Sequence, residues 1–194
     1  MMGSGRAVQD TNYYSLNGSV TKQYIPVNEK PWPVHVSFSD FSISEIYKQN
    51  EIVYRQSAQQ LRYYSFERWS VKPEYLVSEK VFQNIRSMNI FQEFTQSTLI
   101  DSTDYSLTGE VLAIEEFDSL GLWYAHISMS MHLRENQNQL EVWSHSWNTK
   151  KVVEIHTPAL VVSKLSDILD VISNEAAAEM DQYFAMPKTI KKEI

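Results

Sequence analysis

The stretch "EIVYRQSAQQLRYYSFERW", Glu51 to Trp69, decides the fold that we expect for this chain. Its two short runs, Ile52–Arg55 and Leu61–Tyr64, flank a polar connection of hairpin length, which predicts two antiparallel strands. Alternate side chains of a strand face opposite sides of a sheet, so each run offers an apolar set to a core and an arginine to the other face. The aromatic and arginine content would also suit an RNA-binding surface or a catalytic edge.

Composition bounds the class of protein. A chain of 194 residues fits one domain, and 43% hydrophobic and 21% charged residues are ordinary for a soluble globular protein. The formal net charge of -7 repels nucleic acid and anionic membrane surfaces. The densest basic segment is the group of lysines within residues 188–192, at the end of the chain. We therefore expect no nucleic-acid partner and no RNA-binding surface at Glu51–Trp69.

The absence of cysteine and the composition of the two chain ends indicate how the chain is organised. Without cysteine there are no disulfides, no thiolate metal sites and no cysteine nucleophile. No run of about 18 apolar residues is present, so no segment is expected to span a membrane. Residues 1–10 lack an apolar signal-peptide core and are expected to be an expression leader or disordered. Residues 11–186 are expected to form a single domain, followed by a tail at 187–194.

Period-two alternation predicts most of the strands. The segment from Leu122 to Arg134 is the most regular, with the odd-numbered residues from Trp123 to Leu133 mostly apolar and the even-numbered ones polar or aromatic. Its expected antiparallel neighbours are Asp104–Asp118 and Leu140–Trp147. Further extended segments are expected at Tyr13–Leu16, Tyr24–Val27, Val34–Ser39 and Val152–Thr157.

Two segments carry helical periodicity. In residues 72–89, Pro73 suits the first turn, Val77, Val81 and Ile85 form an apolar stripe, and Asn89 is the expected stop. Residues 162–184 have one apolar face. The polar residues expected mostly opposite that face are Asp167, Asp170, Asn174 and Asp181. The order strands, helix, strands, helix predicts an α+β fold: a mostly antiparallel sheet with two main helices, about 72–89 and 162–184, packed on one face.

The search for catalytic or metal-binding residues gives little. His126 and His132 share a strand face, but six residues separate them by about 20 Å, too far to chelate one metal ion. Glu115, Glu116 and Asp118 form an acidic cluster where a strand is expected to end, and solvation is the expected state rather than catalysis. Nucleophile elbows and phosphate loops are absent from the sequence. We therefore predict no enzymatic activity, no metal site and no cofactor.

Four stretches together resemble the ABC-type transport auxiliary lipoprotein family. They are "YYSL" (13–16), "VHVSFSDF" (34–41), "IVYRQSAQQLRYYSFERW" (52–69) and "KPEYLVSEKVFQNI" (72–85). The positions that fit the family's pattern of strands and helix are Ile52, Val53, Arg55, Ser57, Leu61, Tyr63 and Trp69. The resemblance is strongest over residues 13–94. Two departures indicate a divergent branch and bear on partner identity: residues 42–47 lack the proline usual there, and Ser70–Pro73 differs from the usual Ala-Glu-x-Pro.

The resemblance implies a non-catalytic periplasmic lipoprotein. Such a protein is held in a membrane, more commonly the outer one, by an N-terminal acylated cysteine that this sequence does not contain. Its implied partners are a protein with a mammalian-cell-entry domain, a permease and an ATPase. Together these move lipids or other hydrophobic molecules across the cell envelope. The resemblance carries no catalytic residue.

Two groups of residues are candidate interaction sites, and one alternative function stays open. Partner docking, or a role in defining the hairpin, is assigned to Tyr54, Arg55, Arg62, Tyr64 and Trp69. Trp143 and Trp147 are expected to support self-association if they point outward from an edge strand. The alternative function is a small carrier of apolar ligands such as lipid, with a pocket between the last helix and the face that carries Trp123, Met129 and Met131.

Overall fold

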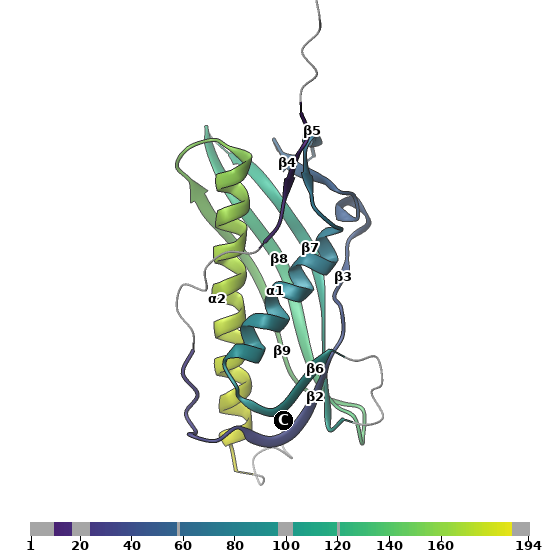
Figure 1. Cartoon of the computed structure of the whole chain (residues 1–194), viewed down its shortest axis with the longest axis vertical. Helices are drawn as coiled ribbons and strands as arrows, with labels where there is room; N and C mark the ends of the chain where they lie inside the picture. Colours follow the sequence, from purple (N-terminus) through teal and green to yellow (C-terminus); the bar gives the residue numbers. More distant parts are fainter. Residues whose placement is uncertain (1–9, 17–23, 58, 97–102, 120, 188–194) are drawn as a thin grey trace, which may run out of the picture.

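A computed structural model describes residues 10–16, 24–57, 59–96, 103–119 and 121–187. Within them lie nine strands, two α-helices and one 3-10 helix (Figure 1). The strands are β1 (Asn12–Tyr14), β2 (Trp32–Phe38), β3 (Ser42–Ile43), β4 (Glu51–Arg55), β5 (Leu61–Trp69), β6 (Phe91–Gln96), β7 (Tyr105–Ser119), β8 (Leu122–Glu135) and β9 (Leu140–Val153). The helices are η1 (Glu45–Tyr47), α1 (Pro73–Ser87) and α2 (Pro158–Ala185). The expected leader and tail lie almost entirely outside the described residues.

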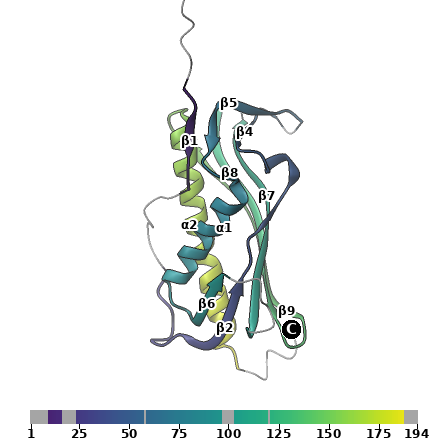
Figure 2. The same cartoon turned by 45° about the vertical axis from the view of Figure 1, so that its right-hand side comes forward.

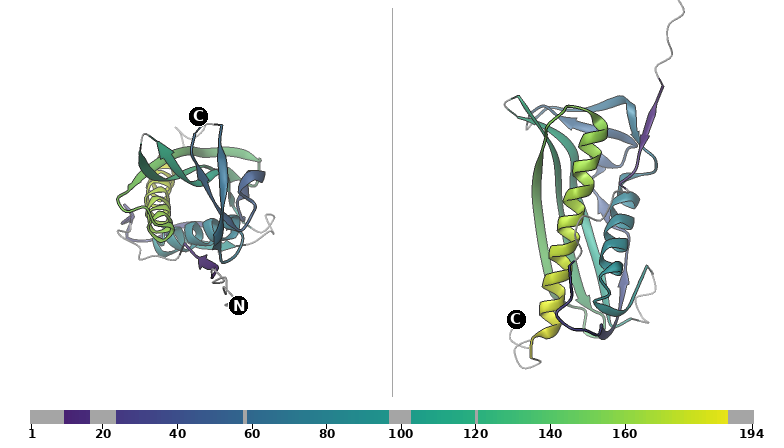
Figure 3. Two further views of the ribbon diagram at one scale, coloured as in Figure 1. Left: turned by 90° about the horizontal axis from the view of Figure 1, so that it is seen from above. Right: turned by 60° about the vertical axis from the view of Figure 1, so that its left-hand side comes forward.

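The long strand β7 organises the sheet. One of its edges pairs in succession with β2, β3 and β4, all parallel, and the other edge pairs with β8 along its length. Beyond β8 lies β9, beyond β2 lies β6, and β5 and β1 follow β4. The sheet is mixed. The two longest pairings, β7–β8 and β8–β9, are antiparallel, whereas most of the shorter pairings are parallel. It curves around the two helices, as the views in Figures 2 and 3 show.

Both helices lie on the same face of this sheet, side by side. Pro73 opens α1, and Asn89, with a left-handed φ of 54°, follows its end, as expected for a stop. The second helix begins at Pro158, four residues before the predicted start, because the Thr157 hydroxyl accepts a hydrogen bond from the Leu160 amide. The predicted α+β class with two helices on one face is confirmed.

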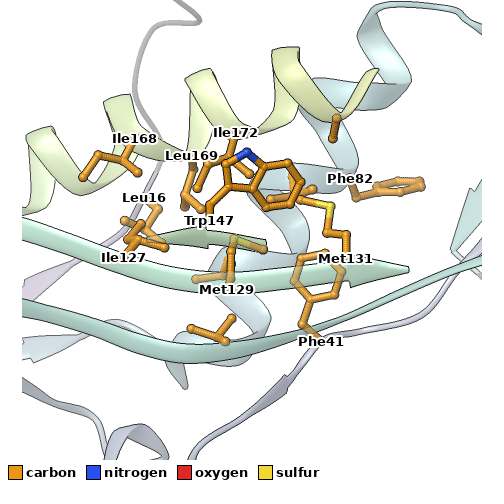
Figure 4. Close-up of a cluster of buried hydrophobic side chains, with 14 of the residues drawn as sticks. Leu16, Phe41, Phe82, Ile127, Met129, Met131, Trp147, Ile168, Leu169 and Ile172 are labelled. Carbon is orange, nitrogen blue, oxygen red and sulfur yellow. The ribbon is translucent and has the colours of Figure 1, made fainter. Parts of the chain in front are cut away.

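The core lies between the sheet and the two helices. The alternation predicted for β8 is confirmed: Ile127, Met129, Met131 and Leu133 are fully buried toward the helices. Figure 4 shows the Trp147 ring between these methionines and the α2 residues Ile168, Leu169 and Ile172. Met129 and Met131 therefore fill the core beneath α2, which is the usual role of such residues.

Two strand predictions are wrong. Residues 24–27 form no strand, and they are instead held against α2 by side-chain hydrogen bonds. The separate strand at Val152–Thr157 does not exist, because the pairing with β8 continues without a break to the pair Trp123–Val153. The first two residues of the predicted strand, Val152 and Val153, thus complete β9, and the remaining residues lead into the cap of α2.

Two polar residues of α2 lie closer to the core than expected. Asp170 pairs with Lys80 of α1 at 2.7 Å, and both side chains are buried in the interface between the helices. Asp181 is fully buried and accepts from the Tyr24 hydroxyl, the Val27 amide and the Trp32 indole at 2.6–2.9 Å. The helix therefore has two buried polar contacts on a face that the sequence analysis assigned mostly to solvent.

A bulge in β7 decides which way its last residues point. Val111 pairs with Met129 and Ala113 pairs with Ser128, so Leu112 is an extra residue without an opposite number. Residues directly opposite in an antiparallel pair share a face. Glu116, opposite Ala125, therefore faces the helices, while Glu115, opposite His126, faces the outer side of the sheet.

Candidate functional site

Glu115 and Glu116 are adjacent residues of β7 that point to opposite faces of the sheet, and both are buried. Their exposed fractions are 2% and 0%. A buried carboxylate requires hydrogen-bond donors or a positive charge nearby. Each of the two glutamates meets a tyrosine hydroxyl and a histidine ring nitrogen within hydrogen-bond distance. Each glutamate is therefore the centre of its own hydrogen-bonded network.

The Glu115 network lies on the outer face, beneath η1. The Arg55 Nε lies 2.8 and 2.9 Å from the two carboxylate oxygens, and the Tyr47 hydroxyl donates to Oε2 at 2.5 Å. His126 places Nδ1 3.1 Å from Oε1 and Nε2 2.9 Å from the Asn148 Oδ1. The network thus connects η1, β4, β7, β8 and β9 through one carboxylate.

The Glu116 network lies on the helix face, near the end of the sheet. The Tyr64 hydroxyl donates to Oε2 at 2.9 Å, and the His156 Nε2 lies 2.7 Å from Oε1. The His156 ring stacks on Trp123 with 4.4 Å between centroids, and Tyr64 packs on Tyr54 at 4.7 Å. No guanidinium or ammonium group pairs with Glu116 among the described residues.

The two networks move the carboxyl pKa values in opposite directions. Burial disfavours the charged form of Glu115, but hydrogen bonds from His126, Arg55 and Tyr47 outweigh it and hold the pKa below its ordinary value. Burial also dominates at Glu116, and the hydrogen bonds from its histidine and tyrosine offset only part of it. The pKa of Glu116 is therefore above its ordinary value.

The expectation of a solvated acidic cluster at this place is wrong. It assumed solvent around the carboxylates, whereas Tyr47 and Arg55 cover Glu115, and side chains of β5 and of the segment before α2 cover Glu116. The partners of the two glutamates come from sequence positions 11 to 68 residues away, so no local pattern indicated that the carboxylates are buried. Arg55, a candidate docking residue, binds the Glu115 carboxylate within the protein.

The five candidate docking residues of the hairpin differ in accessibility. Trp69 is in the core, and Arg55 is mostly covered in the Glu115 network. Tyr54 and Tyr64 are half-buried and stacked on each other. Arg62, which pairs with Tyr54 across the hairpin, is exposed. Of the five, Arg62 is the side chain most available to a partner, and docking through this hairpin stays a prediction.

Trp143 and Trp147 do not point outward, contrary to the premise of their candidate role. Both belong to β9, which pairs with β8 alone among the described strands, so the expected edge strand is present. Their rings face α2, because Trp143 donates to Glu179 at 2.9 Å and Trp147 to Glu175 at 2.8 Å. Self-association through these two rings stays a prediction, and it would require them to leave these contacts.

The outer face of β8 and β9 carries a serine, a histidine and a glutamate in a hydrogen-bonded row. The His132 Nε2 lies 3.2 Å from the Ser130 hydroxyl, and Nδ1 lies 2.9 Å from Glu141 Oε2. Acyl transfer at a serine also needs free backbone N–H groups to hold the oxyanion. Ser130 lies in a strand paired on both sides, with Glu110 and with Ser146, so its backbone groups belong to the sheet. The row therefore lacks the free backbone N–H groups at Ser130 that a serine hydrolase needs to hold the oxyanion.

The remaining features bear on metals, membranes and cavities. Among the described residues, no three His, Asp or Glu side chains come together to hold a metal ion. In the same part of the chain, neither helix has the length and apolar character needed to cross a membrane. An open hollow of about 510 Å³ lies at the end of the sheet beside the Glu116 network. Its lining residues are Gln56, Ser57, Phe117, Asp118, Ser119, Gly121, Leu122 and Trp123.

Comparison with known families assigns this architecture. The sequence pattern of the ABC-type transport auxiliary lipoprotein component matches residues 14–177, which is most of the chain. The chain belongs to this family. ABC-type transport auxiliary lipoproteins are transport components rather than enzymes, and their description implies a membrane-associated place in the cell envelope beside a transporter. The resemblance found in residues 13–94 is thereby confirmed, and the match extends it to residue 177, within α2.

Solved structures share the fold of this auxiliary lipoprotein. Protein XCC0632 from Xanthomonas campestris is 16% identical, with 89% of this chain and 96% of that chain covered and a TM-score of 0.74. An uncharacterized protein is 14% identical, with 89% and 99% covered and a TM-score of 0.70. The hypothetical protein CT253 from Chlamydia trachomatis is 7% identical, with 79% and 98% covered and a TM-score of 0.51. No curated protein sequence matches the chain.

Proposed function

We propose that this auxiliary lipoprotein is a non-catalytic docking subunit of an ABC-type transporter that contains a mammalian-cell-entry-domain protein, a permease and an ATPase. The complex would move lipids or other hydrophobic molecules across the envelope. The auxiliary protein would lie in the periplasm, anchored by an N-terminal lipid, with the outer membrane favoured over the inner one. The family match over residues 14–177 carries this proposal.

The hairpin β4–β5 is the surface that we assign to docking. Glu115 holds its base through Arg55, and Glu116 holds it through Tyr64, so the hairpin is attached to β7 on both faces of the sheet. Because the hairpin is already held, its backbone has little conformational entropy to lose on binding, and the exposed Arg62 projects from it. Exposed arginine and tyrosine are also enriched at protein interfaces.

Affinity purification of the acylated protein from its native host, followed by mass spectrometry, tests the proposal. We expect to recover the mammalian-cell-entry-domain protein, the permease or the ATPase in several detergents. Recovery of no transporter subunit in any of them would contradict the proposed function.

A pair of variants tests the assignment of docking to the hairpin. Arg62→Ala is expected to lower transporter recovery about tenfold, the loss that one charged interface contact commonly causes. The control is Arg134→Ala, an exposed arginine whose pairing with Ser106 places it at the other end of β7. Equal recovery of the two variants would leave the function in place and remove the hairpin from it.

A further inference from the structure

The end of β7 carries a carboxylate oxygen that has no donor. Asp118 is opposite Trp123 in the β7–β8 pair and shares the helix-side face with Glu116. Its Oδ1 is buried and accepts no hydrogen bond from any described residue. A buried carboxylate oxygen without a donor lowers stability, because its hydration is lost without replacement. This position therefore favours the arrival of a donor or a positive charge.

The charges around Asp118 strengthen that preference. Glu116, two residues earlier, has a pKa above its ordinary value, chiefly through burial, and the negative charge of Asp118 raises it further. The pKa of Tyr64 is raised by burial first, then by Glu116 and also by Asp118. None of the ion pairs among the described residues includes Asp118. A cation at this place would reduce the repulsion between the two carboxylates.

Asp118 also lines the hollow between the β4–β5 connection and the β7–β8 turn. The other lining groups include the Gln56 amide, the Ser57 hydroxyl and the rings of Phe117 and Trp123. Aromatic rings attract cations. This end of the sheet already shows such a contact, because the Lys150 Nζ lies 3.5 Å from the centre of the Phe117 ring. Acidic, hydroxyl, amide and aromatic groups thus converge on one open space.

We propose that this hollow binds an arginine side chain of a partner polypeptide, with the Asp118 carboxylate as its counter-ion. A guanidinium fits better than an ammonium, because it stacks on aromatic rings and its weaker hydration suits a site with aromatic walls. The inference rests on the proposed docking function and names the chemistry of the partner. We call this hollow the socket. It lies beside the hairpin that carries Arg62, so the socket and Arg62 would contact the same partner.

The direct test is an NMR titration of the purified chain. The probe is the peptide acetyl-Gly-Ser-Arg-Ser-Gly-amide, and the control peptide carries citrulline, which has the shape of arginine without its charge. We expect the arginine peptide to shift the Trp123 indole and Gly121 amide signals in a saturable way. The citrulline peptide should leave them in place. Equal responses to both peptides, or no response at millimolar peptide, would overturn the proposal.

Variants separate the socket from a general charge effect. Asp118→Asn keeps the shape of the side chain and removes its charge. It should weaken binding of the arginine peptide at least about tenfold. Glu110→Gln removes one charge from an exposed position of the same strand and should leave binding unchanged. Because Asp118 Oδ1 has no described donor, Asp118→Asn should also melt no lower than the wild type. A tenfold loss in both variants would indicate nonspecific attraction and would contradict the site.

Two further measurements identify the source of the cation. Vesicles of phosphatidylethanolamine should shift the Trp123 and Gly121 signals no more than phosphatidylcholine vesicles do, and a larger shift would point to lipid instead of protein. Transporter recovery by Asp118→Asn should also fall. If Asp118→Asn loses the peptide but recovers the transporter at the wild-type level, the docking role of the socket fails and the proposed function stands. If the wild-type chain recovers no transporter, the function fails.

Discussion

Glu115 and Glu116 have the same side chain and nearly the same burial, but they differ in the charge beside them. Glu115 has the Arg55 guanidinium against both oxygens, whereas Glu116 has only a histidine and a tyrosine in hydrogen-bond contact. Breaking a buried ion pair leaves a charge without compensation, while neutralising a poorly paired buried charge removes a cost. The two positions should therefore respond to the same substitution with opposite signs.

Replacing each glutamate by glutamine tests this at neutral pH. Glu115→Gln should lower the free energy of unfolding by about 3 kcal/mol, because Arg55 is left without its carboxylate. Glu116→Gln should raise the melting temperature by about 2 °C, corresponding to ~0.5–1 kcal/mol for a domain of this size. Urea and thermal denaturation measure both, with Glu110→Gln as an exposed control on the same strand. A loss of stability in Glu116→Gln would contradict the assignment.

The pH dependence of the same variants follows from the directions of the two pKa shifts. The lowered pKa of Glu115 contributes stability above the ordinary carboxyl range, and this is lost only as pH falls through the lowered value. The raised pKa of Glu116 means that its charged form costs stability above that pKa, and the cost disappears on acidification. The advantage of Glu116→Gln should therefore fade at a higher pH than the deficit of Glu115→Gln. Melting curves from pH 7 to 3 check this order.

At the scale of elements, periodicity predicted what local sequence controls. The β4–β5 hairpin, the alternation of β8 and the existence of both helices follow from patterns within one segment. The bulge at Leu112 could not be predicted this way, because it depends on the register between two strands. That single residue determines which glutamate meets Arg55. Asp170, Asn174 and Asp181 lie four and seven residues apart, and this helical spacing was an available signal that they share one face.

The contact between α1 and α2 depends on one of those residues. Asp170 accepts from Lys80 at 2.7 Å and from Asn84 at 2.8 Å, inside the interface. Lys80→Met should cost about 3–5 kcal/mol, because it leaves a buried carboxylate without its cation. The double variant Lys80→Met with Asp170→Leu should recover most of this loss. Denaturation of the double-mutant cycle measures the coupling, and additive losses would contradict it.

The matched control for that cycle is the exposed pair Lys164–Glu154, at 3.1 Å. Lys164→Met should change stability by less than about 0.5 kcal/mol, since exposed ion pairs contribute little. A comparable loss at both lysines would mean that the methionine, and not the broken pair, causes the effect at position 80.

At the scale of the whole molecule, Asp181 joins the segment that precedes β2 to the C-terminal part of α2. The segment from Tyr24 to Trp32 lies against α2, and three of its donors reach this one carboxylate. Burial, followed by the hydrogen bond and charge of Asp181, raises the pKa of Tyr24 to about 12. Because β2 follows this segment directly, the carboxylate also sets where the sheet meets the end of α2.

Asp181→Ala should therefore release the segment before it unfolds the domain. Three partly buried donors lose their shared acceptor, at about 0.5–1.5 kcal/mol for each hydrogen bond. We expect much faster hydrogen exchange at Val27 than at the amides of β8, which belong to the sheet interior. The control is Gln182→Ala, the exposed neighbour on the same helix. Hydrogen exchange that rises equally at Val27 and in β8 would show that Asp181 stabilises the whole domain at once and that the segment is not a separately released unit.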